Sequence, residues 1–255
     1  MPHTVGDRGY AVVSCHVERP LDDEVWRRYL ALVRKRPSGF RIATLMRPPD
    51  TAAGERDAHL ARRWIERART AAAHGPFGHH THWTSPTHAR PTGADPAGRV
   101  RSEGAWLRDA GLDARYFCGG GWYIDEDVAG AVADLGYADC TATARRPSYL
   151  PPGERRLGLG RPGWLRLADG RRLLELPTTH SLGEALRALL RRGGPAGEVV
   201  HVHFHDYELL DRRRVAALRL ALALLARRRR ASDLDALAAT VGDEAPETAF
   251  AEAVE

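Results

Sequence analysis

The stretch Val199-Val200-His201-Val202-His203-Phe204-His205-Asp206 carries a histidine at every second position of an otherwise apolar run. β-Branched and aromatic residues favour a strand, and the side chains of a strand alternate between its two faces. We therefore predict that His201, His203 and His205 share one face. Imidazoles are poor material for an apolar core unless something binds them. This strand is predicted to contribute to a functional site.

Two earlier segments end in the same way. In Val12-Val13-Ser14-Cys15-His16-Val17-Glu18, the alternation places His16 and Glu18 on one face. In Phe77-Gly78-His79-His80-Thr81-His82-Trp83, it places His80 and His82 together. One such pair alone would fit hydrogen-bonded core histidines better than a site. Three pairs at predicted strand ends favour a metal or proton-transfer site, provided that the three ends meet.

Strands and helices alternate along the chain, which predicts an α/β fold with a mainly parallel sheet and helical crossovers. Residues 10–17, 40–46, 77–83, 115–118, 137–142 and 199–206 are the predicted strands, and 164–167 with 172–176 form a predicted hairpin. Residues 84–99, rich in Pro, Thr and Gly, are predicted to form a long functional loop before a helix at 102–110. Residues 1–240 are expected to form one domain, followed by an acidic, disordered tail at 241–255.

The composition is that of a globular protein, with 255 residues of which 43% are hydrophobic. The formal charge of +5 does not indicate a nucleic-acid partner, because almost all of the positive charge is arginine interleaved with acidic residues. Lys35 is the only lysine. The dense run Arg227-Arg228-Arg229-Arg230 ends a predicted helix, where cations complement the helix dipole.

Nothing in the sequence indicates a disulfide scaffold, a secretory signal or a membrane span. Cys15, Cys118 and Cys140 fit no CxxC pattern. The first ten residues lack an apolar core, and no apolar run is long enough to cross a bilayer. We therefore expect a soluble, cytoplasmic protein, and the sequence leaves its oligomeric state open.

The order of these segments resembles that of the polysaccharide deacetylase (NodB-homology) family of carbohydrate esterases. The five segments that resemble the family motifs are Ser14-Cys15-His16-Val17-Glu18, Gly78-His79-His80-Thr81-His82-Trp83, Phe117-Cys118-Gly119-Gly120-Gly121-Trp122, Leu174-Glu175-Leu176-Pro177 and Phe204-His205-Asp206. The closing segment Ser232-Asp233-Leu234-Asp235-Ala236-Leu237 is similar to the last helix of the family.

The resemblance implies a distorted (β/α) barrel and a divalent metal, usually zinc, held by an Asp-His-His set. It also implies hydrolysis of an N-acetyl or related amide, with a carboxylate as base and the histidine of the fifth motif as acid. This sequence departs from that pattern. The family's base position falls on His16, and its ligand aspartate falls on Val17, or on Glu18 after a slip of one residue. The second motif histidine falls near Thr84, so that His82 is the nearest imidazole.

From the residues and the resemblance together, we expect a carbohydrate N-deacetylase that hydrolyses a non-peptide C–N bond. The expected ligands of a zinc or similar divalent ion are Glu18, His80 and His82, with His16 as base or further ligand and His205 as acid. The remaining residues expected to contact a small or carrier-linked sugar are Trp83, Gly120, Trp122, His180 and His203. A metal-free amidohydrolase of the same fold and a degenerate barrel that only binds a saccharide are the alternatives.

Overall fold

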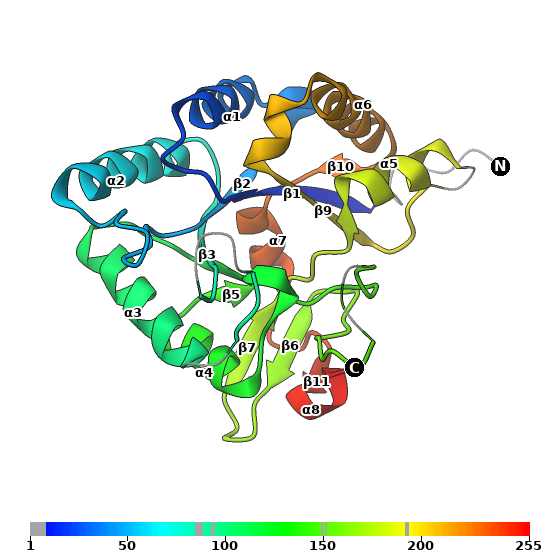
Figure 1. The fold of residues 1–255 in the computed structure, drawn as a ribbon. Coiled ribbons are helices and arrows are strands. Elements are labelled where there is room, and N and C mark those ends of the chain that lie inside the picture. Colours follow the sequence, from blue (N-terminus) through cyan, green and yellow to red (C-terminus); the bar gives the residue numbers. More distant parts are fainter. Residues whose placement is uncertain (1–8, 85–88, 93–94, 149, 151, 192–193) are drawn as a thin grey trace.

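The computed structural model of the chain describes residues 9–84, 89–92, 95–148, 150, 152–191 and 194–255. Its strands form one 11-stranded sheet in the order β11-β6-β7-β5-β4-β3-β2-β1-β9-β8, with β10 beside β1. Between the described strands, only β6 and β7 pair antiparallel. The predicted α/β fold of mainly parallel strands is therefore confirmed (Figure 1). The sheet curves like a distorted barrel, but its path ends at β11 and β8 and is not closed.

The sheet consists of β1 (Tyr10–Val17), β2 (Ala43–Met46), β3 (Phe77–Thr81), β4 (Tyr116–Gly119), β5 (Ala138–Asp139), β6 (Gly163–Arg166), β7 (Arg172–Glu175), β8 (His180–Ser181), β9 (Val199–His205), β10 (Arg230–Ala231) and β11 (Glu247–Ala249). The α-helices are α1 (Asp23–Lys35), α2 (Ala58–Ala72), α3 (Pro96–Asp109), α4 (Glu126–Asp134), α5 (Leu182–Leu190), α6 (Arg212–Arg228), α7 (Leu234–Thr240) and α8 (Phe250–Ala253). Three short 3₁₀ turns complete the described elements: η1 (Pro37–Gly39), η2 (Gly120–Trp122) and η3 (Asp206–Leu210).

Two apolar cores follow from the alternation of side chains along the strands. Outward-facing residues such as Val13 pack under the surrounding helices, where α1 contributes Tyr29, whose hydroxyl group lies 2.5 Å from Thr44 Oγ1. Inward-facing residues such as Val12 form a separate inner core with Leu234 and Leu237 of α7. Figure 1 shows α7 behind the middle of the sheet, where it covers the end of the barrel opposite the strand carboxyl ends. The carboxyl ends are left for a site.

The inner core contains one pair of carboxyl groups. Asp139 on β5 and Glu175 on β7 are opposite each other in the sheet, and both are fully buried. Burial and the adjacent charge of Asp139 raise the pKa of Glu175 well above its usual value. Burial of both groups therefore favours a protonated carboxyl in this pair.

The structure corrects the predicted extent of the loop after β3. Helix α3 begins at Pro96, earlier than the predicted 102, because Asp95 caps it and proline suits the first helical position. The predicted loop at 84–99 is therefore shorter, and its residues 85–88 and 93–94 lie outside the described residues.

The expectation of a disordered tail at 241–255 is wrong. Strand β11 pairs with β6 in parallel, and α8 buries Phe250 and Ala253 against the main core. The acidic composition of the segment predicts disorder and does not reveal that Phe250 and Ala253 become buried. None of the described helices combines the length and the apolar character needed to cross a membrane.

Candidate functional site

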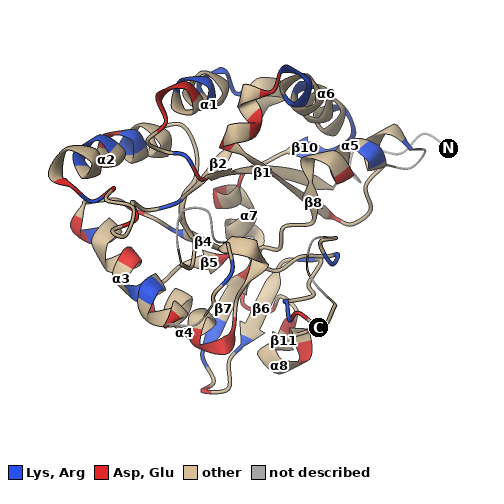
Figure 2. Cartoon of the chain, in the orientation of Figure 1, with Lys and Arg blue, Asp and Glu red and all other residues tan. Residues whose placement is uncertain are grey.

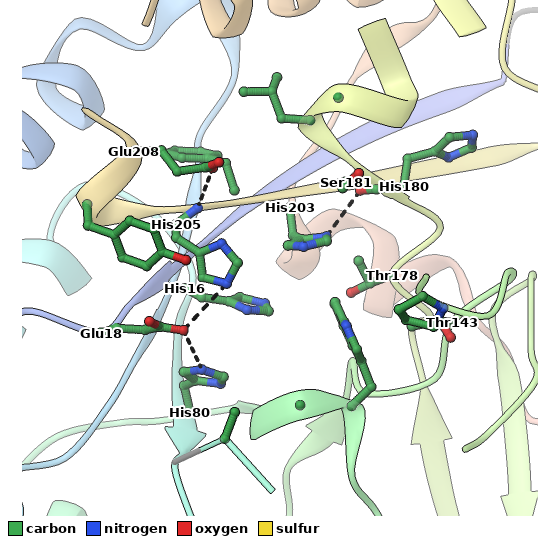
Figure 3. A pocket seen from close by; sticks show the side chains of 18 of the residues that line it. His16, Glu18, His80, Thr143, Thr178, His180, Ser181, His203, His205 and Glu208 are labelled. Atoms are coloured by element: carbon green, nitrogen blue, oxygen red, sulfur yellow. Dashed lines mark hydrogen bonds and ion pairs between the residues drawn. The ribbon is translucent and has the colours of Figure 1, made fainter. Parts of the chain in front are cut away.

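A cavity of about 1080 Å³ opens at the carboxyl ends of the central strands. β1, β3 and β9 bring their polar ends to it, because β1 pairs with β9 on one side and β2 joins β1 to β3 on the other. The histidine motifs contribute six polar lining residues: His16, Glu18, His80, His82, His203 and His205. Figure 3 shows the carboxylate of Glu18 between the rings of His80 and His205. The three strand ends therefore meet.

The carboxylate of Glu18 is the centre of this cluster. Its Oε1 atom lies 3.3 Å from Nε2 of His82, 3.8 Å from Nε2 of His80 and 3.4 Å from Nε2 of His205. Burial alone raises the pKa of Glu18, but the neighbouring rings of His80, His82 and His205 outweigh it. The pKa is held well below its usual value, so Glu18 is ionised at neutral pH.

His80 presents an unprotonated nitrogen to Glu18. Its Nδ1 lies 2.9 Å from the carbonyl oxygen of Cys118, which can only accept a hydrogen bond, so Nδ1 carries the proton. Burial lowers the pKa of His80, which keeps the ring neutral. Nε2 then carries a lone pair that faces a carboxylate oxygen and has no hydrogen-bond partner in the part of the chain that the structure describes. Two acceptors that face each other in a buried site require a cation or a shared proton between them.

These donors fit a divalent metal. One ligand atom from each of Glu18, His80 and His82 lies within 4.8 Å of the others, and both ring nitrogens of His82 are buried with no hydrogen-bond partner among the described residues. Neutral imidazoles and one carboxylate are a ligand set of zinc, and a carbonyl that fixes the histidine tautomer is a usual second partner in such sites. The set is the one that the sequence predicts; the identity of an ion is not fixed by it.

His16 lies deeper, among other rings. Its centroid is 4.6 Å from that of His80 and 5.1 Å from that of His203. Burial lowers the pKa of His16 well below its usual value, and Nε2 has no hydrogen-bond partner. His16, His80 and Cys118 form a second group within ligand range. Burial raises the pKa of the Cys118 thiol well above its usual value, which disfavours the thiolate that would bind a metal there.

His205 is fixed by the 3₁₀ turn that follows it. Its backbone N–H donates to Glu208 Oε2 at 3.0 Å, and its ring stacks on Tyr207 with centroids 5.1 Å apart. Burial lowers the pKa of His205, although Glu18 and Glu208 oppose the shift. The ring is about a quarter exposed, at 26%, so it faces the cavity rather than the core.

The other two histidines of β9 differ from His205. His203 Nδ1 lies 3.2 Å from the carbonyl oxygen of His180, and its ring packs on Trp122. His201 is fully buried below the cavity, where Nε2 is 2.8 Å from Ser14 Oγ. Burial lowers its pKa to about 4. The shared face of the three histidines is confirmed, but the environment of His201 is that of a hydrogen-bonded core histidine.

The residues expected to contact substrate divide into two groups. Trp122, His180 and His203 line the cavity, whereas Trp83 and Gly120 are not among its lining residues. The indole N–H of Trp83 donates to the carbonyl oxygen of Gly120 at 2.9 Å, and the Trp83 ring contacts Tyr123. Their contact instead joins the segment after β3 to the 3₁₀ turn η2.

Asp206 is a residue of the site to which the sequence assigned no role. Its carboxylate accepts the backbone N–H groups of Glu18 and Arg19 at 3.2 and 2.9 Å. It therefore joins the end of β1 to the end of β9. Burial raises its pKa to about 6, even though these hydrogen bonds lower it. The signal available in the sequence was its position directly after His205.

Neither a protein-family model nor a curated protein sequence matches the chain. The CE4 family pseudoenzyme BA3943 from Bacillus anthracis has a TM-score of 0.52 at 12% identity, over 95% of this chain and 70% of its own. A BA3943 mutant with restored enzymatic activity has a TM-score of 0.52 at 11% identity, over 91% and 68%. The chain has the CE4 fold. The resemblance seen in the sequence is thus confirmed at the level of the fold, since these identities show no more than that.

The chain is also similar to part of a larger enzyme. The 4-α-glucanotransferase from Thermococcus litoralis has a TM-score of 0.57 at 12% identity, over 94% of this chain. The chain spans 41% of the length of that protein.

Proposed function

We propose that this chain is a metal-dependent amide hydrolase that removes an N-acetyl or related acyl group from a carbohydrate. The observation that carries the proposal is the group of Glu18, His80 and His82. Their ligand atoms lie close together at the carboxyl ends of the strands, and among the described residues Nε2 of His80 and Nε2 of His82 have no hydrogen-bond partner. A divalent ion bound there would lower the pKa of a water molecule towards about 7 and polarise the amide carbonyl.

His205 is the residue proposed to move the proton. Addition of water to the carbonyl releases one proton, and departure of the amine consumes one. A neutral imidazole can accept the first and deliver the second. His205 suits this role because it is neutral, faces the cavity and is held by Glu208 and Tyr207. His16 is neutral too and is the candidate for a base or a further ligand.

The cavity suits a sugar with an attached group. Its volume of about 1080 Å³ lies at the upper end of ordinary small-molecule sites. Trp122 supplies an aromatic wall, and Thr143 and Thr178 supply hydroxyl groups on the side away from Glu18 (Figure 3). We propose a small or carrier-linked sugar rather than a polymer.

The test combines metal content with turnover. Protein purified without a histidine tag should contain about one equivalent of zinc or a similar ion per chain. It should release acetate from an N-acetylated sugar, and a chelator should abolish this activity until the metal is restored. A protein that deacetylates after its metal has been removed would contradict the proposal and support a metal-free hydrolase.

The second candidate is a saccharide-binding protein without turnover. The observation that favours it is His16, an uncharged ring where the family resemblance implies a catalytic carboxylate. Tight binding of an N-acetylated sugar without acetate release, in protein that carries its full complement of metal, would select this candidate.

A further inference from the structure

The two ends of the cavity differ in chemistry. At one end lie Glu18 and the histidines, whereas His180, Ser181 and Thr143 lie at the other (Figure 3). The charged side chains of this second end include Arg145, from the loop after β5, and Arg187, from α5. Figure 2 shows positive charge on α5, beside the open end of the sheet. One end of the cavity therefore carries the proposed metal ligands, and the other end carries cationic side chains.

The two arginines lack the ion pairs that other arginines of the cavity make. Arg47 pairs with Glu55 at 2.7 Å, and Arg214 pairs with Glu208. Within the part of the chain that the structure describes, neither Arg145 nor Arg187 has an ion pair or a hydrogen bond to a carboxylate. Unpaired guanidinium groups that line a cavity are available to an anionic ligand.

The carboxylate of Glu184, three residues before Arg187 on α5, is already occupied. Glu184 Oε2 accepts the backbone N–H and the hydroxyl group of Ser181, both at 2.8 Å, in the capping box of α5. A Cβ atom placed on Gly183 would lie 3.5 Å from Nη1 of Arg187, so the guanidinium lies over the first turn of this helix. Gly183 itself lines the cavity. Arg187 is thus an exposed cation at the rim of the cavity.

A smaller cavity of about 310 Å³ adjoins this end and adds a third cation. Arg145, His180 and Arg187 line both cavities, and Arg191 lines the smaller one. Burial, followed by the charge of Arg145, lowers the pKa of His180, so this ring adds hydrogen bonding without charge. Three arginines and one carboxylate, that of Glu184, are the charged side chains that line the smaller cavity. Its lining therefore has a net positive charge.

We propose that Arg145 and Arg187 form a phosphate subsite, so that the substrate is an N-acylated sugar bearing a phosphate or a phosphate-linked carrier. Guanidinium groups match the oxygens of a phosphate with paired hydrogen bonds, which a neutral sugar cannot reproduce. The identity of the substrate class rests on the proposed function, but the anion subsite itself does not.

The first experiment measures binding without turnover. Purified full-length protein is titrated calorimetrically with inorganic phosphate, and the R145Q/R187Q variant is compared with the wild type. Glutamine keeps a polar side chain and removes the charge. We expect the variant to bind phosphate about 10- to 100-fold more weakly. The matched control is R34Q/R219Q, which removes two exposed arginines of α1 and α6 and should bind as the wild type does. Equal affinity of R145Q/R187Q and the wild type would overturn the subsite.

The second experiment measures selectivity. The wild type should have a higher kcat/KM for N-acetylglucosamine 1-phosphate than for N-acetylglucosamine, by about 10- to 100-fold, and R145Q/R187Q should lose this preference. A wild type that hydrolyses both sugars equally would refute the assignment. If neither sugar is hydrolysed but phosphate binding still depends on the two arginines, the proposed function fails while the subsite stands. Nucleoside diphosphate and short alkyl diphosphate conjugates of the same sugar then distinguish a nucleotide carrier from a lipid carrier.

Discussion

Glu18 Oε1 lies 3.4 Å from Nε2 of His205, so the ends of the neighbouring strands β1 and β9 meet at the cavity. His203, two residues earlier on β9, is instead held by the carbonyl oxygen of His180. The two histidines share a face but have different partners. This difference can be tested by removing them one at a time.

His205→Ala should lower kcat by about 10²- to 10⁴-fold while metal stays bound, because a proton-transfer group is lost and the three proposed ligands remain. His203→Ala should have a smaller effect, since it removes packing against Trp122 rather than a group near Glu18. Turnover and metal content of both variants on one N-acetylated sugar provide the measurement. Loss of metal from His205→Ala would make this histidine a ligand, and His180 would become the next candidate for the acid.

His80→Ala should remove most of the bound metal. The variant loses one of three ligands together with the carbonyl contact that fixes its tautomer. Elemental analysis of untagged protein measures the effect. His59→Ala is the control, because His59 is exposed on α2 away from the cavity. Full metal occupancy in His80→Ala would place the metal elsewhere.

Cys118→Ser distinguishes the two groups of potential ligands. If the metal is held by Glu18, His80 and His82, this buried thiol is not required, and metal content and turnover should remain close to those of the wild type. If His16, His80 and Cys118 hold it, the variant should lose its metal. Trapping of an acyl group on Cys118 in the wild type would indicate a cysteine nucleophile and contradict the proposed mechanism.

Glu175→Gln should change how stability depends on pH. The pKa of Glu175 is raised on folding, so between the usual carboxyl pKa and the raised value the folded state binds more protons than the unfolded state. Glu175 should therefore contribute a loss of stability as pH rises through this window, of up to about 1.4 kcal/mol per pH unit. The buried histidines, whose pKa values are lowered, contribute in the opposite direction, so the quantity to measure is the difference between variant and wild type. Urea unfolding should show that Glu175→Gln gains stability relative to the wild type between pH 5 and pH 8, whereas the exposed control Glu66→Gln should not.

Local periodicity predicted the elements that carry the site. The alternation of β9 placed His203 and His205 on the inner face, and that of β3 separated His80 and His82 from His79, whose Nε2 lies 2.8 Å from Glu103 instead. Strand alternation is a property of neighbouring residues, so it can be inferred from the sequence alone.

Other features depend on contacts that neighbouring residues do not reveal. Arg145 and Arg187 come to line the same cavity because α5 and the loop after β5 lie side by side at the open edge of the sheet. The tail was mistaken for disorder because the strand that β11 pairs with, β6, is distant in sequence. Trp83 was expected to contact substrate, but the partner of its indole N–H was not visible in the sequence.

The carboxylate of Asp206 is bonded to backbone groups 187 and 188 residues away. The contact between Glu18 and His205 therefore closes a loop of most of the chain. Contacts so remote in sequence form slowly, because the intervening loop must lose its conformational freedom first. The inner core closes over a similar separation, since Val12 of β1 packs there with Leu234 of α7, so the core and the arrangement proposed to hold an ion require the same pairing of β1 with β9. An ion that binds only the closed form then opposes its reopening, and makes the rate of unfolding depend on metal concentration.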